Sequence, residues 1–221
     1  MLATFRRVVG RVADWTIWHT SGSSAAFWDR HYAAGGTSGP GSRGVLARMK
    51  ADMVNRLITD YSVESVVELG CGDGYQASLL VAKHYTGLDV APRAVRLCTE
   101  RFRHDTAKSF LLYTPGVPLP GGVQIQADMA LSLDVIFHLV EQGVYERYMT
   151  DLFRLARRAV VIYSTNGDVA RREPKYTKRR VFTDWIRANV TGWELTEQHL
   201  NPYPELSRCG FYVYTRPSGS I

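Results

Sequence analysis

Residues 65–74 are Ser-Val-Val-Glu-Leu-Gly-Cys-Gly-Asp-Gly, a short apolar run that ends in three alternating glycines. Such a run predicts a buried strand of a parallel sheet followed by a tight turn. Glycine in a turn allows positive φ angles and lets a ligand approach the backbone closely. In open parallel sheets, ligands bind beyond the carboxyl ends of the strands. The stretch therefore predicts a class of fold and the edge of the sheet that binds a ligand.

Strands and helices alternate on both sides of this stretch. Apolar spacing predicts a helix over 45–58, and further apolar runs predict strands at 85–89, 109–113, 127–134 and 159–163. Helical patterns separate them, at 77–82, 91–102 and 141–157, which indicates parallel pairing. The last two strands, 193–199 and 211–214, have no helix between them and so pair antiparallel. We predict an α/β fold: a doubly wound, mostly parallel seven-stranded sheet with a C-terminal antiparallel hairpin.

The first part of the chain differs in composition. We divide it into residues 1–44, with N-terminal helices and a glycine-rich loop, and the main domain at 45–221. The loop, 35–44, is long for a connection without secondary structure, and such loops often act as lids. We expect 38–42 to close over the site and exclude water. Trp28 and Tyr32, just before it, either stack on a sugar or pack in the core, and packing is the favoured interpretation.

Residues 1–18 have an apolar face and carry Arg6, Arg7 and Arg11 elsewhere. Two interpretations remain open: a basic amphipathic helix on a membrane surface, or a helix that docks on the protein or on a second subunit of a homodimer. Arg11 and Asp14 interrupt any signal-peptide core. Three sparse cysteines fit a reducing compartment. We therefore expect a cytoplasmic protein, peripheral to the inner face of the membrane if the helix binds lipid.

Lys and Arg number 27 against 21 Asp and Glu, a net charge of +6. A hydrophobic fraction of 45% excludes a disordered chain. The positive surplus lies in the first eleven residues and in the loop 171–180. Nucleic acid is an unlikely partner, because this loop has a single aromatic residue, Tyr176, and the chain has no room for a separate RNA-binding domain.

Carboxylates surround the glycine turn. Glu68 precedes it, Asp73 lies inside it, and Asp89 ends the next strand, 21 residues after Glu68. Glu68 and Asp73 would repel a pyrophosphate and favour a cationic ligand, whereas an acid at the position of Asp89 accepts hydrogen bonds from ribose hydroxyls. The set predicts a nucleoside with a positively charged amino-acid tail, which describes S-adenosylmethionine. The alternatives are an NAD site and a turn without a ligand.

Residues 66–76 resemble motif I of class I S-adenosylmethionine-dependent methyltransferases, and residues 85–95 resemble the segment that carries their ribose-binding acid. The resemblance implies a Rossmann-like methyltransferase fold. It also implies that the turn holds the methionine end of the cofactor and that Asp89 holds the ribose. Because 112–116 lack the acid that many members place near adenine, backbone groups near Ala127 and Asp128 are assigned to adenine. The complete predicted cofactor set is Glu68, Gly70, Cys71, Gly72, Asp73, Gly74, Asp89, Val90, Asp128 and Leu133.

Asp134 and His138 follow the fourth predicted strand, four residues apart. A helical turn would bring them together, and an imidazole oriented by a carboxylate is a suitable base for deprotonating a hydroxyl acceptor. The alternative is structural: His138 caps a helix and Asp134 accepts from loop amides. The segment also resembles one in ubiquinone-biosynthesis O-methyltransferases that is associated with a divalent cation. Phe137 stands at one of the ligand positions and cannot ligate, so we predict no metal.

Residues 28–43, 131–138, 161–166 and 180–185 together resemble a bacterial methyltransferase group associated with glycan assembly. This resemblance implies O-methylation of a sugar or a glycan precursor. Tyr163, Asn166, Arg172 and Lys178 are the predicted acceptor-binding residues, since hydroxyl and amide groups orient polyols and basic groups bind phosphate. The alternatives are O- or N-methylation of another small metabolite, methylation or binding of RNA, and cofactor binding without catalysis.

Overall fold

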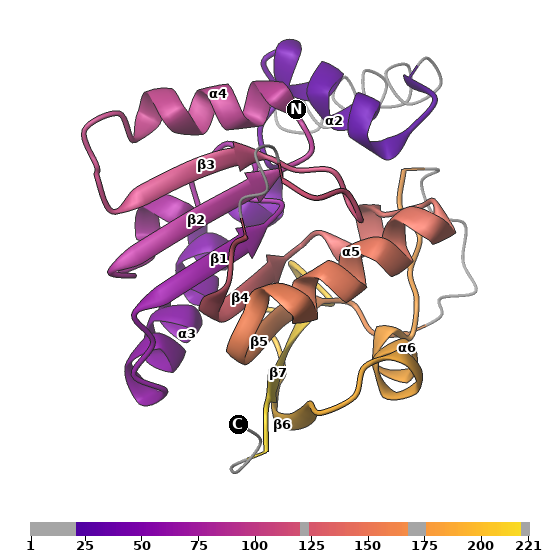
Figure 1. Cartoon of the computed structure of the whole chain (residues 1–221). Coiled ribbons are helices and arrows are strands. Elements are labelled where there is room, and N and C mark those ends of the chain that lie inside the picture. Colours follow the sequence, from indigo (N-terminus) through magenta and orange to yellow (C-terminus); the bar gives the residue numbers. More distant parts are fainter. Residues whose placement is uncertain (1–20, 120–123, 168–175, 218–221) are drawn as a thin grey trace.

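The computed structural model describes residues 21–119, 124–167 and 176–217 (Figure 1). The predictions for residues 1–18 and for Arg172 lie outside these ranges. Seven strands form one sheet in the order β3-β2-β1-β4-β5-β7-β6. Their bounds are β1 Ser65–Leu69, β2 His84–Asp89, β3 Lys108–Leu112, β4 Ala127–Leu133, β5 Ala156–Ser164, β6 Glu194–His199 and β7 Gly210–Thr215.

The first five strands pair in parallel, and β7 runs antiparallel to both β5 and β6. The predicted fold class and the C-terminal hairpin are confirmed. Strand order reverses between β1 and β4, because β1 leads to β2 on one side and β4 continues on the other. This is the switch point at which the carboxyl ends of parallel strands leave room for a ligand.

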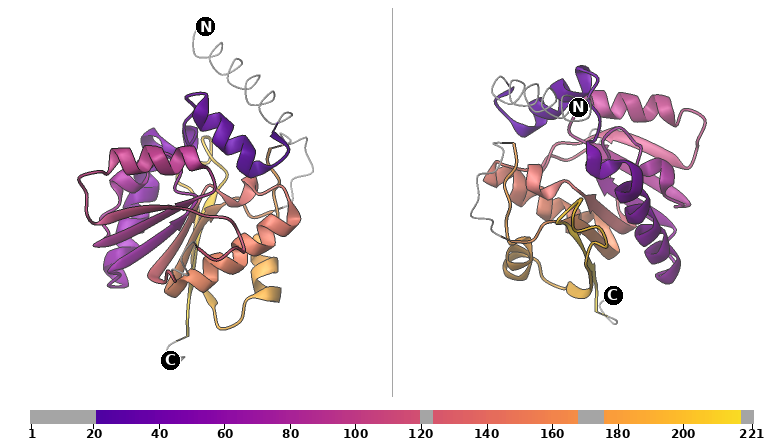
Figure 2. Two further views of the ribbon diagram at one scale, coloured as in Figure 1. Left: turned by 45° about the horizontal axis from the view of Figure 1, so that its top comes forward. Right: turned by 180° about the vertical axis from the view of Figure 1, so that it is seen from behind.

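Helices cover both faces of the sheet (Figure 2). They are α2 Ser24–Ala33, α3 Gly44–Asp60, α4 Pro92–Arg101, α5 Gln142–Leu155 and α6 Phe182–Asn189. Along β1, Val66 packs in the core cluster that contains residues of α3, and Val67 packs in the cluster that contains residues of α5 and α6. Burial on both faces explains why the strands are continuous apolar runs rather than alternating ones.

One predicted helix is much shorter than expected. The apolar spacing at 77–82 predicts a helix after the glycine turn, but only a single 3-10 turn forms there, η2 Ala77–Leu79. The chain leaves this turn in extended conformation at Leu80 and enters β2 at His84. The spacing reflects burial of Ala77 and Leu80 against α3 rather than helical periodicity.

The predicted lid lies over the carboxyl edge of the sheet. Helix α2 lies beside α4 in both figures, and the backbone amide of Arg93 donates to Asp29 Oδ1 at 2.9 Å. The glycine-rich loop then runs through a 3-10 turn, η1 Pro40–Ser42, into α3. The loop therefore contains little regular secondary structure, but a helix holds each of its two ends.

Candidate active site

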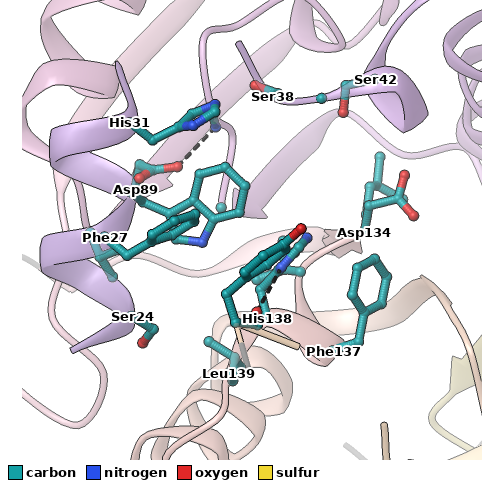
Figure 3. Close-up of a pocket in the computed structure, with 18 of the residues that line it drawn as sticks. Ser24, Phe27, His31, Ser38, Ser42, Asp89, Asp134, Phe137, His138 and Leu139 are labelled. Atoms are coloured by element: carbon teal, nitrogen blue, oxygen red, sulfur yellow. Dashed lines mark hydrogen bonds between the residues drawn. The ribbon is translucent and has the colours of Figure 1, made fainter. Parts of the chain in front are cut away.

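A cavity of about 530 Å³ opens at the carboxyl ends of β1, β2 and β4 (Figure 3). Helix α2 and residues 37–42 of the lid form one side, and the segment from Leu133 to Leu139 forms another. This volume lies within the range of about 300–1,000 Å³ that is typical of small-molecule sites. The cavity is thus built by the switch point, the lid and the chain that follows β4.

The glycine turn borders this cavity through Gly70 and Gly72, whose φ angles are 82° and 58°. A Cβ at Gly70 would lie 2.5 Å from Val135 Cγ2, and one at Gly72 would lie 2.2 Å from Ser38 Oγ. Both positions therefore need glycine for the backbone conformation and for space. Gly74 also has a positive φ, but it packs against Cys98 and Phe102, away from the cavity.

Asp89, the last residue of β2, lines the cavity beside this turn. Its Oδ2 accepts from the backbone amide of Gly72 and its Oδ1 from that of Ala91, each at 2.9 Å. Burial raises the pKa of Asp89 to about 6, and the backbone hydrogen bonds act in the opposite direction. The two amides fix the carboxylate, and each oxygen keeps a second lone pair for a ligand hydroxyl.

Glu68 lies beneath the turn rather than on the main cavity. Its carboxylate is buried, accepts from the Tyr85 hydroxyl, and borders a small neighbouring cavity of about 20 Å³ together with Lys50. Burial raises the pKa of Glu68 to about 7, while the hydrogen bond from Tyr85 and the charge of Lys50 lower it. Glu68 was expected to contact the ligand directly. It instead supports the glycine turn from beneath.

The remaining predicted cofactor residues divide into four groups. Val90 and Leu133 line the main cavity, whereas Cys71 borders only the small one. Asp73 points to the lid. The assignment of Asp128 to adenine is wrong, because Asp128 is the second residue of β4 and lies at the amino end of the sheet, where its Oδ2 accepts from the amides of Glu64 and Ser65.

Asp73 is the residue that fastens the lid to the turn. Its carboxylate accepts from the Ser38 amide and forms an ion pair with Arg43, while its own amide donates to Ser38 Oγ. The Tyr32 hydroxyl lies 3.1 Å from the same Ser38 oxygen. These contacts join α2, the lid and the glycine turn, and they lower the pKa of Asp73, against desolvation, through hydrogen bonds led by that from Arg43.

His138 lines the cavity at the end of a 3-10 turn, η4 Ile136–His138. Its ring lies edge-on to Trp28, with centroids 4.9 Å apart. Its Nδ1 lies 3.4 Å from the carbonyl oxygen of Tyr176, a long contact that favours the proton on Nδ1 and leaves Nε2 as the acceptor. Burial lowers the pKa of His138 to about 4, so the ring is neutral at physiological pH.

The predicted Asp134–His138 pair does not form: no hydrogen bond joins these two described residues. Asp134 lines the cavity, but its Oδ2 accepts from Lys50 Nζ at 2.6 Å. Figure 3 shows its carboxylate pointing away from His138. A turn of α-helix was expected here, but the structure has a 3-10 turn that begins at Ile136. A 3-10 helix has three residues per turn, so residues four positions apart do not lie on the same face.

None of the described residues predicted to bind the acceptor lines the cavity. The Tyr163 hydroxyl accepts from Asn201 at 3.0 Å, and Asn166 bonds to Thr183 at the start of α6. Lys178 is exposed, and its backbone amide donates to the Phe137 carbonyl at 2.7 Å. These placements were wrong because the Tyr163 side chain packs in the core cluster that contains residues of α3, while contacts with α6 and with η4 hold Asn166 and Lys178.

Sequence reasoning missed several cavity residues. Packing in the core was the favoured interpretation for Trp28 and Tyr32, yet both also line the cavity, as do Phe27 and His31 of the same helix. The aromatic cluster at 27–32 was the feature of the sequence that could have indicated these residues. Which of its side chains face the cavity depends on the position of α2, which the sequence does not give. Other lining residues that no motif marked are Tyr113, Phe137, Glu141, Arg147, Tyr148 and Tyr176.

The cavity fits the predicted cofactor. Gly70 and Gly72 leave their backbone open to it, and the fixed carboxylate of Asp89 lies beside them at the end of the next strand. Residues 67–163, which carry this arrangement, match the family model described as "Methyltransferase domain". This part of the chain is similar to a methyltransferase domain. Together with the fold and the fit of the cavity to the cofactor, the match identifies the chain as an S-adenosylmethionine-dependent methyltransferase.

Solved structures similar to this methyltransferase agree on the fold. The methyltransferase domain of "bacterial-CtHen1-C" superposes with a TM-score of 0.62 at 20% identity, covering 77% of this chain and 98% of that one. The N-methyltransferase NodS from Bradyrhizobium japonicum WM9 gives 0.61 at 16%, covering 80% and 99%. Magnesium protoporphyrin IX methyltransferase from Synechocystis PCC 6803, solved with bound SAM, gives 0.61 at 16%, covering 92% and 97%. At these identities the likeness concerns the fold alone.

A search of curated proteins finds no significant match to the chain. Among the residues described, no helix is both long enough and apolar enough to span a membrane.

Proposed function

We propose that this methyltransferase transfers a methyl group to a hydroxyl of a small acceptor of the sugar or glycan-precursor class, with His138 as the base. One observation carries the proposal: a neutral, cavity-lining imidazole lies in the same cavity as the glycine turn and Asp89. A hydroxyl is a weak nucleophile until its proton is removed, so a base within this cavity suits an oxygen acceptor.

When bound, S-adenosylmethionine supplies an electrophilic methyl group on its sulfonium. Gly70, Gly72 and Asp89 hold the cofactor, and the lid covers the turn through Ser38 and Asp73. His138 accepts the acceptor proton at Nε2, since Nδ1 is directed to the Tyr176 carbonyl. Placing acceptor and methyl group in one cavity supplies proximity, which accounts for much of the rate in such displacements.

Aromatic rings form the side of the cavity around this base. Phe27 stacks on Tyr176 with centroids 5.5 Å apart, and Trp28 lies edge-on to both Phe27 and His138. Aromatic faces of this kind suit the apolar C–H faces of a sugar ring, which supports the proposed acceptor class. The resemblance to glycan-assembly methyltransferases supports the same class.

A second candidate is an amine acceptor, and Glu141 favours it. Glu141 lines the cavity at the start of α5, and its Oε1 accepts from the Ser24 amide at 2.7 Å. Its Oε2 is buried and has no hydrogen-bond partner. A buried carboxylate oxygen without a partner is unfavourable, and an ammonium group beside aromatic rings would satisfy it.

Incubation with methyl-labelled S-adenosylmethionine and a panel of acceptors separates the two candidates. The panel holds nucleotide sugars, lipid-linked glycans, small phenols and their amino-substituted counterparts. We expect label on the oxygen of a sugar acceptor, and far less with His138→Ala. Label found only on amines, with loss in Glu141→Gln but not in His138→Ala, would support the second candidate and contradict the first.

A further inference from the structure

Lys50 is the only lysine or arginine with a fully buried side chain in the part of the chain that the structure describes. It projects from α3, and its Nζ donates to Asp134 Oδ2 at 2.6 Å. The Tyr163 ring centroid lies 5.4 Å from the same nitrogen. A buried ammonium group is unfavourable unless it is paired, so this lysine is tied to the carboxylate that it contacts.

Asp134 is itself in an unusual conformation. It follows β4 directly, its φ is 62°, and its amide donates to the Tyr163 carbonyl at 2.9 Å. A non-glycine residue in the left-handed region is strained and persists only where its surroundings hold it. Its side chain is 15% exposed, in the wall of the cavity. Lys50 contacts one carboxylate oxygen, so Asp134 retains capacity to accept from a ligand.

The position of Asp134 indicates which end of the cofactor it meets. The next residue, Val135, fills the space beside Gly70 in the glycine turn. On the lid side, a Cβ at Gly41 would lie 2.8 Å from Asp134 Oδ2. Asp134 thus lies between the turn and the lid, and Figure 3 shows it on a different side of the cavity from Asp89. If Asp89 holds the ribose, Asp134 lies where the amino-acid end extends.

We propose that Asp134 binds the α-ammonium group of the amino-acid end of S-adenosylmethionine, and that Lys50 is the positioning residue that holds Asp134 for this contact. Hydrogen bonds between an ammonium and a carboxylate are among the strong ones in proteins. Lys50 pairs with Asp134 and borders the same small cavity as Glu68, so its single charge serves more than one carboxyl group. The inference rests on S-adenosylmethionine being the cofactor.

Two ligands that differ in the amino-acid end test the contact. S-adenosylhomocysteine carries the ammonium group, and 5′-methylthioadenosine lacks the whole amino-acid end. By calorimetry, we expect Asp134→Asn to weaken S-adenosylhomocysteine binding by about tenfold or more, as for a lost hydrogen bond to a charged group. Binding of 5′-methylthioadenosine should stay within about twofold. Asp52→Asn, an exposed change on α3, should affect neither ligand.

Lys50→Met should show the same selectivity and should also destabilise the fold, because Asp134 then lacks its partner. The double variant Lys50→Met with Asp134→Asn removes the unpaired charge, so thermal stability should recover while S-adenosylhomocysteine affinity stays low. If either single variant weakens both ligands equally, or neither, the inference is overturned. If Lys50→Met does not fold, Asp134→Asn and the double variant still decide it. Failure of the wild type to bind S-adenosylhomocysteine would instead contradict the cofactor assignment.

Discussion

His138 shows how much a single residue depends on its surroundings. In solution its imidazole would be partly protonated near pH 6.5. In the cavity, packing against Trp28 and Phe137 removes it from water and favours the neutral ring. The sequence placed Asp134 beside it as an orienting acid, but the Tyr176 carbonyl takes that position. A neutral ring is the form that accepts a proton.

Replacing His138 by Ala should lower kcat by about 100-fold or more, in the range expected for loss of a general base. S-adenosylhomocysteine affinity should be nearly unchanged, since the glycine turn and Asp89 are intact. Because burial lowers the pKa of His138 to about 4, kcat of the wild type at saturating cofactor should not fall with a midpoint near 6.5 as pH decreases, but only near pH 4 to 5. An unchanged kcat in His138→Ala would make the residue structural.

Glu68 allows a test through stability and pH. Its pKa is raised from 4.5 to about 7, so the folded state holds this proton more tightly than the unfolded state does. The free energy of unfolding contributed by Glu68 therefore decreases as pH rises from about 4.5 to about 7. The Glu68→Gln variant has no carboxyl group to titrate at this position, so its unfolding free energy does not decrease in this way. The melting temperature of Glu68→Gln minus that of the wild type should thus increase between pH 5 and pH 7.5.

Asp89 and His138 titrate in both the variant and the wild type, so their contributions to the melting temperature cancel in the difference. Glu100→Gln, at an exposed site on α4, is the matched control and should give a difference that does not change with pH. A constant difference for Glu68→Gln as well would contradict the raised pKa.

At the scale of elements, the lid and the glycine turn act as one unit. Loop 35–44 was predicted to cover the site, and Ser38, Arg43 and Asp73 now provide the contacts that hold it there. Arg43 also lies over the Tyr75 ring at 4.3 Å. The lid therefore closes on residues of the turn itself, so a change in the turn affects both the cofactor site and its cover.

Gly72→Ala should weaken S-adenosylhomocysteine binding by about tenfold or more, since a Cβ there would meet Ser38 Oγ at 2.2 Å and the Tyr32 hydroxyl at 2.9 Å. Gly35→Ala is a matched control: its φ of 82° is also positive, but nothing lies within 4 Å of the added carbon. This control should cost about 1–2 kcal/mol of stability through backbone strain alone and leave affinity intact. Calorimetry and thermal melts measure both effects, and equal affinity losses would contradict the packing argument.

At the scale of the whole molecule, the cavity joins segments far apart in the chain. Residues from α2, the turn after β1, the end of β2, the segment after β4 and α5 all line it. A ligand bound there contacts parts of the protein that otherwise meet only through the sheet. Binding to the folded state alone stabilises it by mass action.

Saturation with S-adenosylhomocysteine at 100 times its Kd should add about 2.7 kcal/mol, a rise of roughly 5–11 °C in melting temperature for a chain of this size. Asp89→Asn should lose most of this rise, because its amide cannot accept from both the Gly72 and Ala91 backbone groups. Differential scanning fluorimetry with and without ligand measures the shift. A full shift in Asp89→Asn would contradict the role of this carboxylate.

The sequence by itself determined the α/β class, the C-terminal hairpin, the glycine turn with Asp89, and the methyltransferase assignment, because these depend on short apolar patterns and on residues within one βαβ unit. Only the tertiary structure decided the partners of the charged groups. Lys50 meets Asp134 across 84 positions, and Ser38 meets Asp73 across 35. Asp128 was misassigned and Tyr163 lies outside the cavity, since strand ends and helix positions decide which edge of the sheet a side chain occupies. Local spacing carries no information about such contacts, because packing between distant elements creates them.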